Sequence, residues 1–121
     1  MPEKEKSSKS ETERLVEEFL EDLELARNCS PLTLRNYRHY LGRFSSWLKE
    51  NFPKAKLTSI DLEIIKKYRL FLARFTAPDG TPLSRSTQAY HLIALRSFFK
   101  WLAKNDWKVL APEKIDVPKM P

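Results

Sequence analysis

Cationic, hydroxyl and amide side chains gather on one face of a predicted helix near residues 31–51. At 100° per residue, that face carries Arg35, His39, Gly42, Arg43 and Ser46, with Asn36 beside it. No acidic residue shares the face. Arginine, hydroxyl and amide groups donate hydrogen bonds to phosphate oxygens. The face therefore suits a polyanionic ligand.

A second stretch, residues 84–104, also begins with groups that could bind phosphate. Ser84 is a predicted N-cap, and Arg85, Ser86 and Thr87 follow it in the first turn. Backbone N–H groups at a helix start bind anions readily. The rest of the stretch is apolar around most of its circumference, which predicts a helix buried in a bundle. Arg96 and Lys100 fall on a different side from Thr87, and we interpret them as peripheral cations.

Residues for enzymatic or metal chemistry are sparse. His39 and His91 lie on different predicted helices, and Cys29 is the single cysteine, so we expect no metal site, cofactor or internal disulfide. No glycine-rich phosphate loop and no catalytic constellation is present in the sequence. One cysteine suits a reducing cytosol, so we expect a cytoplasmic protein. No apolar run approaches the ~18 residues that would span a membrane.

Four predicted helices position these groups. The first covers Glu11–Ala26 and has an apolar stripe at three- and four-residue steps. The second begins after Ser30 as N-cap and Pro31 as first helical residue, and it ends near Asn51. The third begins at Thr58, where Asp61 can complete the cap, and the fourth is the stretch 84–104. With two glycines and no alternating apolar pattern, the sequence predicts an all-α fold without β-structure.

Charge divides the 121-residue chain into an acidic start and a basic remainder. Residues 1–26 contain nine acidic and four basic residues, a net charge of −5, whereas residues 27–121 contain seven acidic and eighteen basic residues, a net charge of +11. The basic part suits a polyanion. The acidic side of the first helix is interpreted either as a solvated face or as a surface that contacts a basic neighbour.

Composition also predicts how the chain is organised. Residues 1–10 are charged and lack aliphatic periodicity, so we expect a disordered tail. Residues 11–110 are expected to form one helical domain. Residues 111–121 contain three prolines and are expected to be an extended linker toward a further domain.

The helix patterns, taken in order, resemble the tyrosine recombinase or phage integrase family. The resemblance rests on Leu15-Val16-x-x-Phe19-Leu20, Ser30-x-x-Thr33-x-x-x-Tyr37-x-x-x-Leu41-x-x-Phe44-x-x-Trp47-Leu48, Ser84-x-x-Thr87 and Leu95-Arg96-Ser97-Phe98-Phe99-x-Trp101-Leu102. The ending Val117-Pro118-Lys119-Met120-Pro121 is similar to the family's bridge into its catalytic domain. Ala111 stands where the family usually has asparagine. The resemblance covers residues 12–121.

The resemblance implies the core-binding, SAM-like domain, an orthogonal bundle of four main helices. In the family, the second and fourth helices address the DNA major groove and its flanking phosphates. By position, the implied DNA contacts are Thr33, Arg35, Asn36, His39 and Arg43 in the second helix and Arg85, Ser86, Thr87, Tyr90 and His91 in the fourth. For Tyr90, core packing is the alternative role. The implied partners are a double-stranded DNA half-site and neighbouring recombinase protomers, with no membrane and no small-molecule substrate.

The family's catalytic set of arginines, lysine, histidines and a nucleophilic tyrosine lies beyond the bridge. We therefore expect this chain to bind DNA without cutting it and to be part of a longer recombinase. The alternative function is a helical protein–protein interaction module that docks through the acidic first helix. The two functions are compatible, because neighbouring protomers in the family touch partly through this domain.

Overall fold

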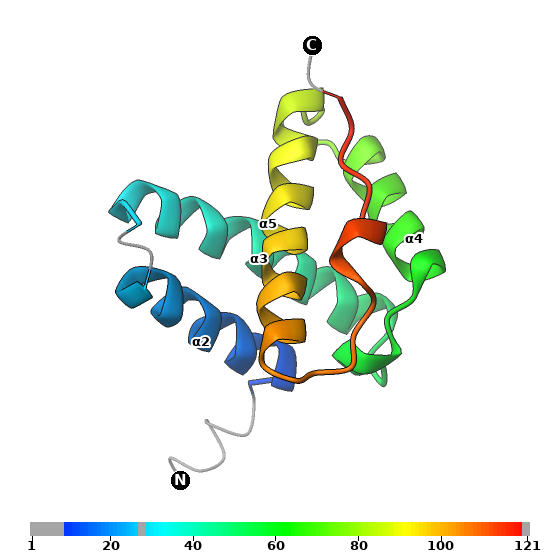
Figure 1. The fold of residues 1–121 in the computed structure, drawn as a ribbon. Coiled ribbons are helices and arrows are strands. Elements are labelled where there is room, and N and C mark those ends of the chain that lie inside the picture. The colour runs from blue at the N-terminus through cyan, green and yellow to red at the C-terminus, as the bar shows by residue number, and fades with distance from the viewer. Residues whose placement is uncertain (1–8, 27–28, 120–121) are drawn as a thin grey trace, which may run out of the picture. The chain divides into compact units, whose positions relative to one another are not determined.

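The computed structural model describes residues 9–26 and 29–119, which contain four α-helices and two short 3-10 helices. The only β-pairing among the described residues is an isolated antiparallel bridge between Thr76 and Pro82. The predicted all-α fold is therefore confirmed. Most of the expected N-terminal tail, residues 1–8, lies outside the described residues, as do Met120 and Pro121 at the chain end. Figure 1 shows the path of the chain.

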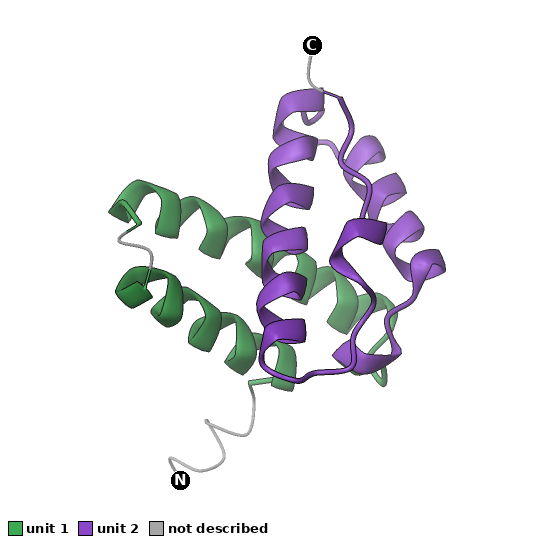
Figure 2. Ribbon diagram, in the orientation of Figure 1, with its two compact units in different colours: residues 1–56 green, residues 57–121 purple. Residues whose placement is uncertain are grey.

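The chain divides into two compact units, residues 1–56 and residues 57–121 (Figure 2). The sequence predicted one helical domain over residues 11–110, and that extent remains a prediction.

Unit 1 is a pair of helices, α2 (Glu11–Ala26) and α3 (Pro31–Asn51), with the predicted bounds. Helix α2 starts with a reciprocal cap that we did not predict from the sequence. The Ser10 N–H donates to Glu13 Oε1 at 2.8 Å, and the Glu13 N–H donates to Ser10 Oγ at 3.1 Å. This exchange satisfies two backbone donors at the helix start. It also lowers the pKa of Glu13 below its usual value, because the carboxylate accepts the Ser10 backbone hydrogen bond.

The two helices of unit 1 pack against each other along their apolar stripes (Figure 1). The rings of Phe19 on α2 and Tyr37 on α3 stack with centroids 6.5 Å apart. Glu17 on α2 forms an ion pair with Arg38 on α3. One member of the acidic face on α2 therefore contacts a basic neighbour within the same unit. The buried apolar side chains of this unit's helices are Leu15, Val16, Phe19, Leu20, Leu23, Leu41, Phe44, Trp47 and Leu48.

Unit 2 begins with the 3-10 helix η1 (Leu57–Ser59) and continues with α4 (Leu62–Arg74). The predicted start of this helix at Thr58 is wrong. Asp61 is the N-cap, and its Oδ1 accepts the Ile64 N–H at 3.0 Å. Thr58 instead lies in η1, and the fully buried side chain of Leu57 holds this turn inward. A hydroxyl three residues before an aspartate thus gave a false capping signal.

A tight turn lies in the segment that joins α4 to α5. Gly80 has a φ of 87°, in the left-handed region that glycine adopts without steric cost. Asp79 Oδ1 accepts the Thr81 N–H at 3.0 Å, and the Ala77 N–H donates to the Thr81 carbonyl at 2.8 Å. These bonds deliver the chain to the start of the next helix in a defined position.

Helix α5 (Arg85–Lys104) has Ser84 as its N-cap, as predicted, and is the central buried element of unit 2. Leu95, Phe98, Phe99 and Leu102 are fully buried. The helix ends where Asp106 adopts a φ of 69°, and the Trp107 N–H returns to the Leu102 carbonyl. Such a left-handed residue after the last turn is a common helix stop.

The segment after α5 differs from the extended chain that its prolines suggested. Pro112–Lys114 form the 3-10 helix η2, and the following Ile115 is fully buried. The proline fixes a φ compatible with a helical first position, and the isoleucine supplies apolar surface to bury. Chain beyond residue 110 is thus folded onto α5 at least to Ile115 (Figure 1). Its role as a bridge to a further domain remains a prediction.

Candidate nucleic-acid interface

Helices α3 and α5 begin with the same side-chain arrangement. In each, a serine N-cap is followed three residues later by a threonine: Ser30 and Thr33 in α3, Ser84 and Thr87 in α5. The serine Oγ accepts the threonine N–H at 3.1 Å and lies 3.0 Å from the threonine Oγ1, to which it donates. Because that oxygen accepts from serine, the threonine keeps its own hydroxyl proton for another acceptor. Each helix start therefore offers a hydroxyl donor beside the positive end of the helix dipole.

The predicted face of α3 is accessible in the structure. Arg35 and His39 are exposed, and Thr33, Asn36 and Arg43 are half-buried. All five predicted residues of this helix therefore reach its surface. The neighbouring Arg38 is also exposed but is paired with Glu17.

The arginines of helix α3 lie in its first turns, and its one acidic residue lies near its end. Its single acidic residue, Glu50, lies in the last turn, whereas Arg35, Arg38 and Arg43 precede it. The helix therefore presents cations and hydrogen-bond donors over its first three turns, where the helix dipole adds positive potential at the N-terminus. Such donors and cations can bind anionic oxygens, those of phosphate among them.

The first two turns of α5 show a similar but smaller surface. Arg85 is exposed, and Ser86 and Thr87 are half-buried. Tyr90 has 44% of its surface exposed, so the alternative of core packing does not describe it. An exposed tyrosine one turn from a threonine donor can hydrogen-bond or stack on a ligand.

His91 does not share this surface. Its side chain is 1% exposed, and its Nδ1 lies 2.8 Å from the Thr87 carbonyl oxygen one turn earlier. The residue sits at the start of the buried side of α5, where Ala89 and Leu92 are also buried. We therefore leave His91 out of the candidate interface, because a buried imidazole cannot touch a macromolecular ligand.

The later cations of α5 have separate roles. Lys100 is exposed, as expected for a peripheral cation. Arg96 is half-buried and donates two hydrogen bonds to the Ile115 carbonyl oxygen, from Nε at 3.0 Å and from Nη2 at 2.6 Å. Arg96 is therefore a structural anchor rather than a surface charge, and only the first two turns of α5 remain in the candidate interface.

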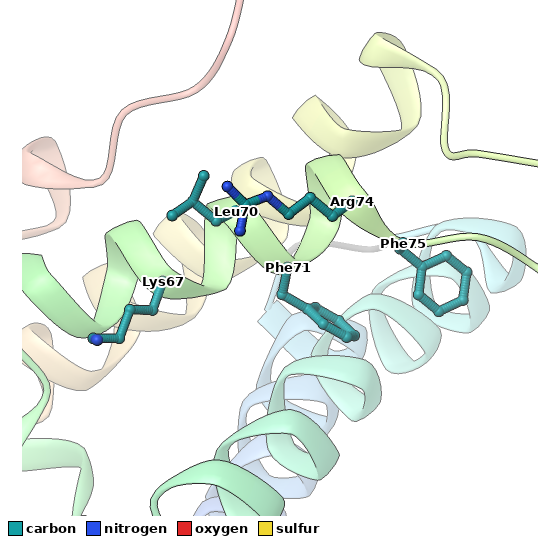
Figure 3. Close-up of a pocket in the computed structure, with 5 residues that line it drawn as sticks. All are labelled: Lys67, Leu70, Phe71, Arg74 and Phe75. Atoms are coloured by element: carbon teal, nitrogen blue, oxygen red, sulfur yellow. The ribbon is translucent and has the colours of Figure 1, made fainter.

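A pocket of about 490 Å³ lies on α4 (Figure 3). It is lined by Lys67, Leu70, Phe71, Arg74 and Phe75. The rings of Phe71 and Phe75 meet edge to face with centroids 5.8 Å apart. This lining contains no carboxylate, imidazole, hydroxyl or thiol, and we assign the pocket no role.

The described residues contain no group of three or more His, Cys, Asp or Glu side chains that could hold a metal ion. Among the same residues, none of the helices is both long enough and apolar enough to cross a membrane.

Comparison with known proteins identifies the family of the chain. The family model for the phage integrase N-terminal SAM-like domain matches residues 16–106. Tyrosine recombinase XerC 2 of Ralstonia nicotianae is 30% identical over 109 residues, which are 89% of this chain and 31% of that protein. Tyrosine recombinase XerC of Escherichia coli K12 is 30% identical over 107 residues, 88% of this chain and 34% of that protein.

The chain thus spans about a third of the length of the curated relatives it matches. No solved structure matches it significantly. The family match covers most of the chain and includes α3, α4 and α5 entirely. The chain therefore belongs to the family of N-terminal SAM-like domains of phage integrases and tyrosine recombinases.

Proposed function

We propose that this chain is the DNA-binding part of a site-specific tyrosine recombinase and that it acts on a double-stranded DNA half-site in the cytoplasm. The observation that carries the proposal is the repeated helix start. Helices α3 and α5 each have a threonine hydroxyl beside the N-cap serine and an arginine two residues from that threonine, with no acidic residue in the first turn. The proposed contacts are Thr33, Arg35, Asn36, His39, Arg43, Arg85, Ser86, Thr87 and Tyr90.

The contact groups divide by what they can recognise. Thr33, Arg85 and Thr87 lie in first turns, where hydroxyl, guanidinium and backbone donors suit phosphate oxygens. Asn36 and His39 lie further along the face of α3, and an α-helix fits the major groove of B-form DNA. Asparagine pairs well with the adenine edge there, and arginine with guanine. Phosphate contacts would set the position of the domain, and the α3 face would contribute sequence preference.

Bulk charge supports the same partner. Residues 27–121 carry a net charge of +11, and the exposed arginines of α3 and α5 belong to this part. Lysine and arginine side chains that neutralise phosphates release condensed counterions, which favours association at low salt. The acidic first segment would be repelled by the same DNA, so we propose no DNA contacts from it.

We further propose that recombination chemistry is not performed by these residues. Of the four tyrosines, Tyr68 is buried, Tyr37 stacks on Phe19, and Tyr40 packs beside His39 with ring centroids 5.7 Å apart. Tyr90 is exposed, but it sits on the proposed contact surface of α5. We assign none of them as a nucleophile. The strand-cleaving residues would belong to the two thirds of the relatives' length that this chain does not span.

A direct binding measurement tests the proposal. Fluorescence anisotropy of labelled duplex DNA should rise on addition of the protein, and the affinity should fall steeply as salt increases. Arg35→Gln should weaken binding, whereas Lys54→Gln, which removes an exposed cation of unit 1 outside α3, should weaken it less. Absence of binding at low salt, or equal effects of the two variants, would contradict the proposed role of the α3 face.

One observation favours a second function, docking of another protein on α2. Leu25 has 85% of its surface exposed near the end of a face on which Glu18, Glu21, Asp22 and Glu24 are also exposed. An apolar side chain rimmed by acids suits a basic protein partner, including a neighbouring recombinase protomer. Sedimentation velocity with and without DNA separates the functions. Self-association without DNA that Leu25→Ser abolishes would favour docking.

A further inference from the structure

Unit 2 contains a cleft of about 550 Å³ between α4, α5 and the end of the described chain. Lys66 and Arg69 line it from α4, and Arg85 and Gln88 line it from the first turn of α5. Leu92 and Pro118 form part of its apolar wall. The α4 and α5 residues that line the cleft are about 19 positions apart in sequence. The periodicity of either helix alone does not predict that they meet.

The cleft is strongly one-sided in charge. Three cations line it, and no acidic residue does. Asp116 forms an ion pair with one of these cations: its Oδ2 lies 3.9 Å from Arg69 Nη1, and its side chain is 78% exposed. An exposed ion pair at that distance contributes little, so it does not neutralise the cleft. Three like charges converging on a concave surface focus a positive potential there.

The cleft also adjoins the first turn of α5. Arg85 is the first residue of that helix, and the Ser84 cap takes up the N–H of Thr87. The positive end of the helix dipole therefore adds to the side-chain charges. Arg85 is shared between this cleft and the proposed DNA contacts of α5, which makes the two surfaces continuous.

We propose that this cleft holds a phosphate of the DNA backbone, with Lys66 and Arg69 as additional DNA contacts supplied by α4. The inference rests on the proposed function and extends it to a third helix. Duplex DNA presents a phosphate about every 3.4 Å of axis along each strand, so a strand that reaches Thr87 and Tyr90 has further phosphates within range of a neighbouring cationic cleft. The lysine acts as a mobile point charge, and the arginines donate bidentate hydrogen bonds to phosphate oxygens.

The test compares two double variants of α4 in anisotropy titrations with duplex DNA. Lys66→Gln/Arg69→Gln removes the two α4 cations of the cleft. Lys67→Gln/Arg74→Gln removes the same charges from the same helix, at exposed residues outside the cleft. The cleft variant should bind about tenfold more weakly or worse at ~0.1 M salt, and the slope of log K against log salt should shrink by about two. The control variant should lose less affinity and less slope.

A second pair of variants tests the same cleft in the opposite direction. Asp116→Asn removes the carboxylate nearest to Arg69, and Glu113→Gln removes an exposed carboxylate from the same segment. Asp116→Asn should tighten DNA binding more than Glu113→Gln does, and equal effects would count against the cleft. Circular dichroism confirms that each variant is folded.

The outcomes separate this inference from the function on which it rests. If wild-type protein binds DNA and the two α4 variants weaken binding equally, the cleft is overturned while the proposed function stands. If the cleft variant changes self-association in sedimentation but leaves DNA affinity unchanged, the cleft receives an acidic protein segment and the inference is also overturned. If wild-type protein fails to bind duplex DNA at low salt, the proposed function itself fails.

Discussion

Arg96 and Ile115 are joined by two hydrogen bonds, from the Nε and Nη2 of the arginine to the backbone carbonyl oxygen of the isoleucine. The isoleucine side chain is fully buried, directly after the last residue of η2. The guanidinium group of Arg96 and the buried side chain of Ile115 thus hold the segment after η2 against α5.

Replacing Arg96 with methionine should release this anchor. The variant keeps apolar bulk but leaves the Ile115 carbonyl without its two donors, which should cost about 1–3 kcal/mol of unfolding free energy. Hydrogen exchange should increase in peptides covering residues 109–119. The control is Lys100→Met, which changes an exposed residue one turn later. It should alter the free energy of unfolding by no more than about 0.5 kcal/mol and leave hydrogen exchange in residues 109–119 unchanged. Unchanged exchange in the Arg96 variant would show that Ile115 burial alone holds the segment.

Replacing Gly42 with alanine should raise the stability of the protein while lowering its affinity for DNA. Gly42 lies in the interior of α3, it is exposed, and a Cβ built on it meets nothing within 4 Å. Alanine should therefore stabilise the helix by about 0.5–1 kcal/mol in urea unfolding. If DNA approaches the α3 backbone closely, the added methyl group should also weaken DNA binding. A variant that is more stable and binds DNA as tightly as wild type would show that DNA does not approach this turn.

At the start of α5, substitutions of Ser84 and Thr87 should affect folding stability and DNA binding separately. Ser84→Ala removes the N-cap of α5 and should cost about 1 kcal/mol of stability. Thr87→Val removes the donor hydroxyl but keeps the side-chain shape, so it should weaken DNA binding by about 1–2 kcal/mol, roughly fivefold to thirtyfold, with little loss of stability. Thr87→Ser should retain most of the affinity. Wild-type affinity in Thr87→Val would exclude this hydroxyl from the interface.

Local sequence signals predicted much of the helical framework. Ser30 followed by Pro31 located the start of α3, and Ser84 located the start of α5, because a cap and the first helical turn are determined by adjacent residues. The same kind of signal failed at Thr58, because two possible caps three residues apart compete there. Burial of Leu57 and Ile60 in the preceding turn left Asp61 as the cap. Local propensity does not reveal that packing.

The candidate site was predictable only where exposure follows from helix periodicity. The α3 face was predicted correctly as a surface, since its apolar stripe fixes the opposite side. His91 was misplaced because it follows Thr87 by one turn on the helix, yet tertiary packing buries it. The cationic cleft and the bond from Arg96 to Ile115 each join residues about 19 apart in sequence. Contacts at that separation depend on the chain's path through space, which no periodic pattern specifies.

Acid should weaken the start of α2 through Glu13. Its pKa is lowered by the backbone hydrogen bond from Ser10, so the folded state favours the carboxylate more than the unfolded state does. The resulting stabilisation is present above the unfolded pKa of about 4.5 and is lost as pH falls through the lower folded pKa. Urea unfolding at about pH 7 and about pH 3 should therefore show a smaller acid-induced loss in Glu13→Gln than in wild type.

The matched control for that experiment is Glu18→Gln, which changes an exposed glutamate of the same helix. It should show the full wild-type loss at low pH. Equal losses in wild type and Glu13→Gln would mean that the reciprocal cap with Ser10 does not contribute measurably to folding.

A titration of isotope-labelled protein with duplex DNA, followed by amide NMR shifts at low salt, tests the central claim most directly. DNA binding through the two capped helix starts predicts that the largest shifts fall at residues 33–43 of α3 and 85–90 of α5, and that salt reverses them. Shifts confined to α2, or no shifts at all, would contradict the account.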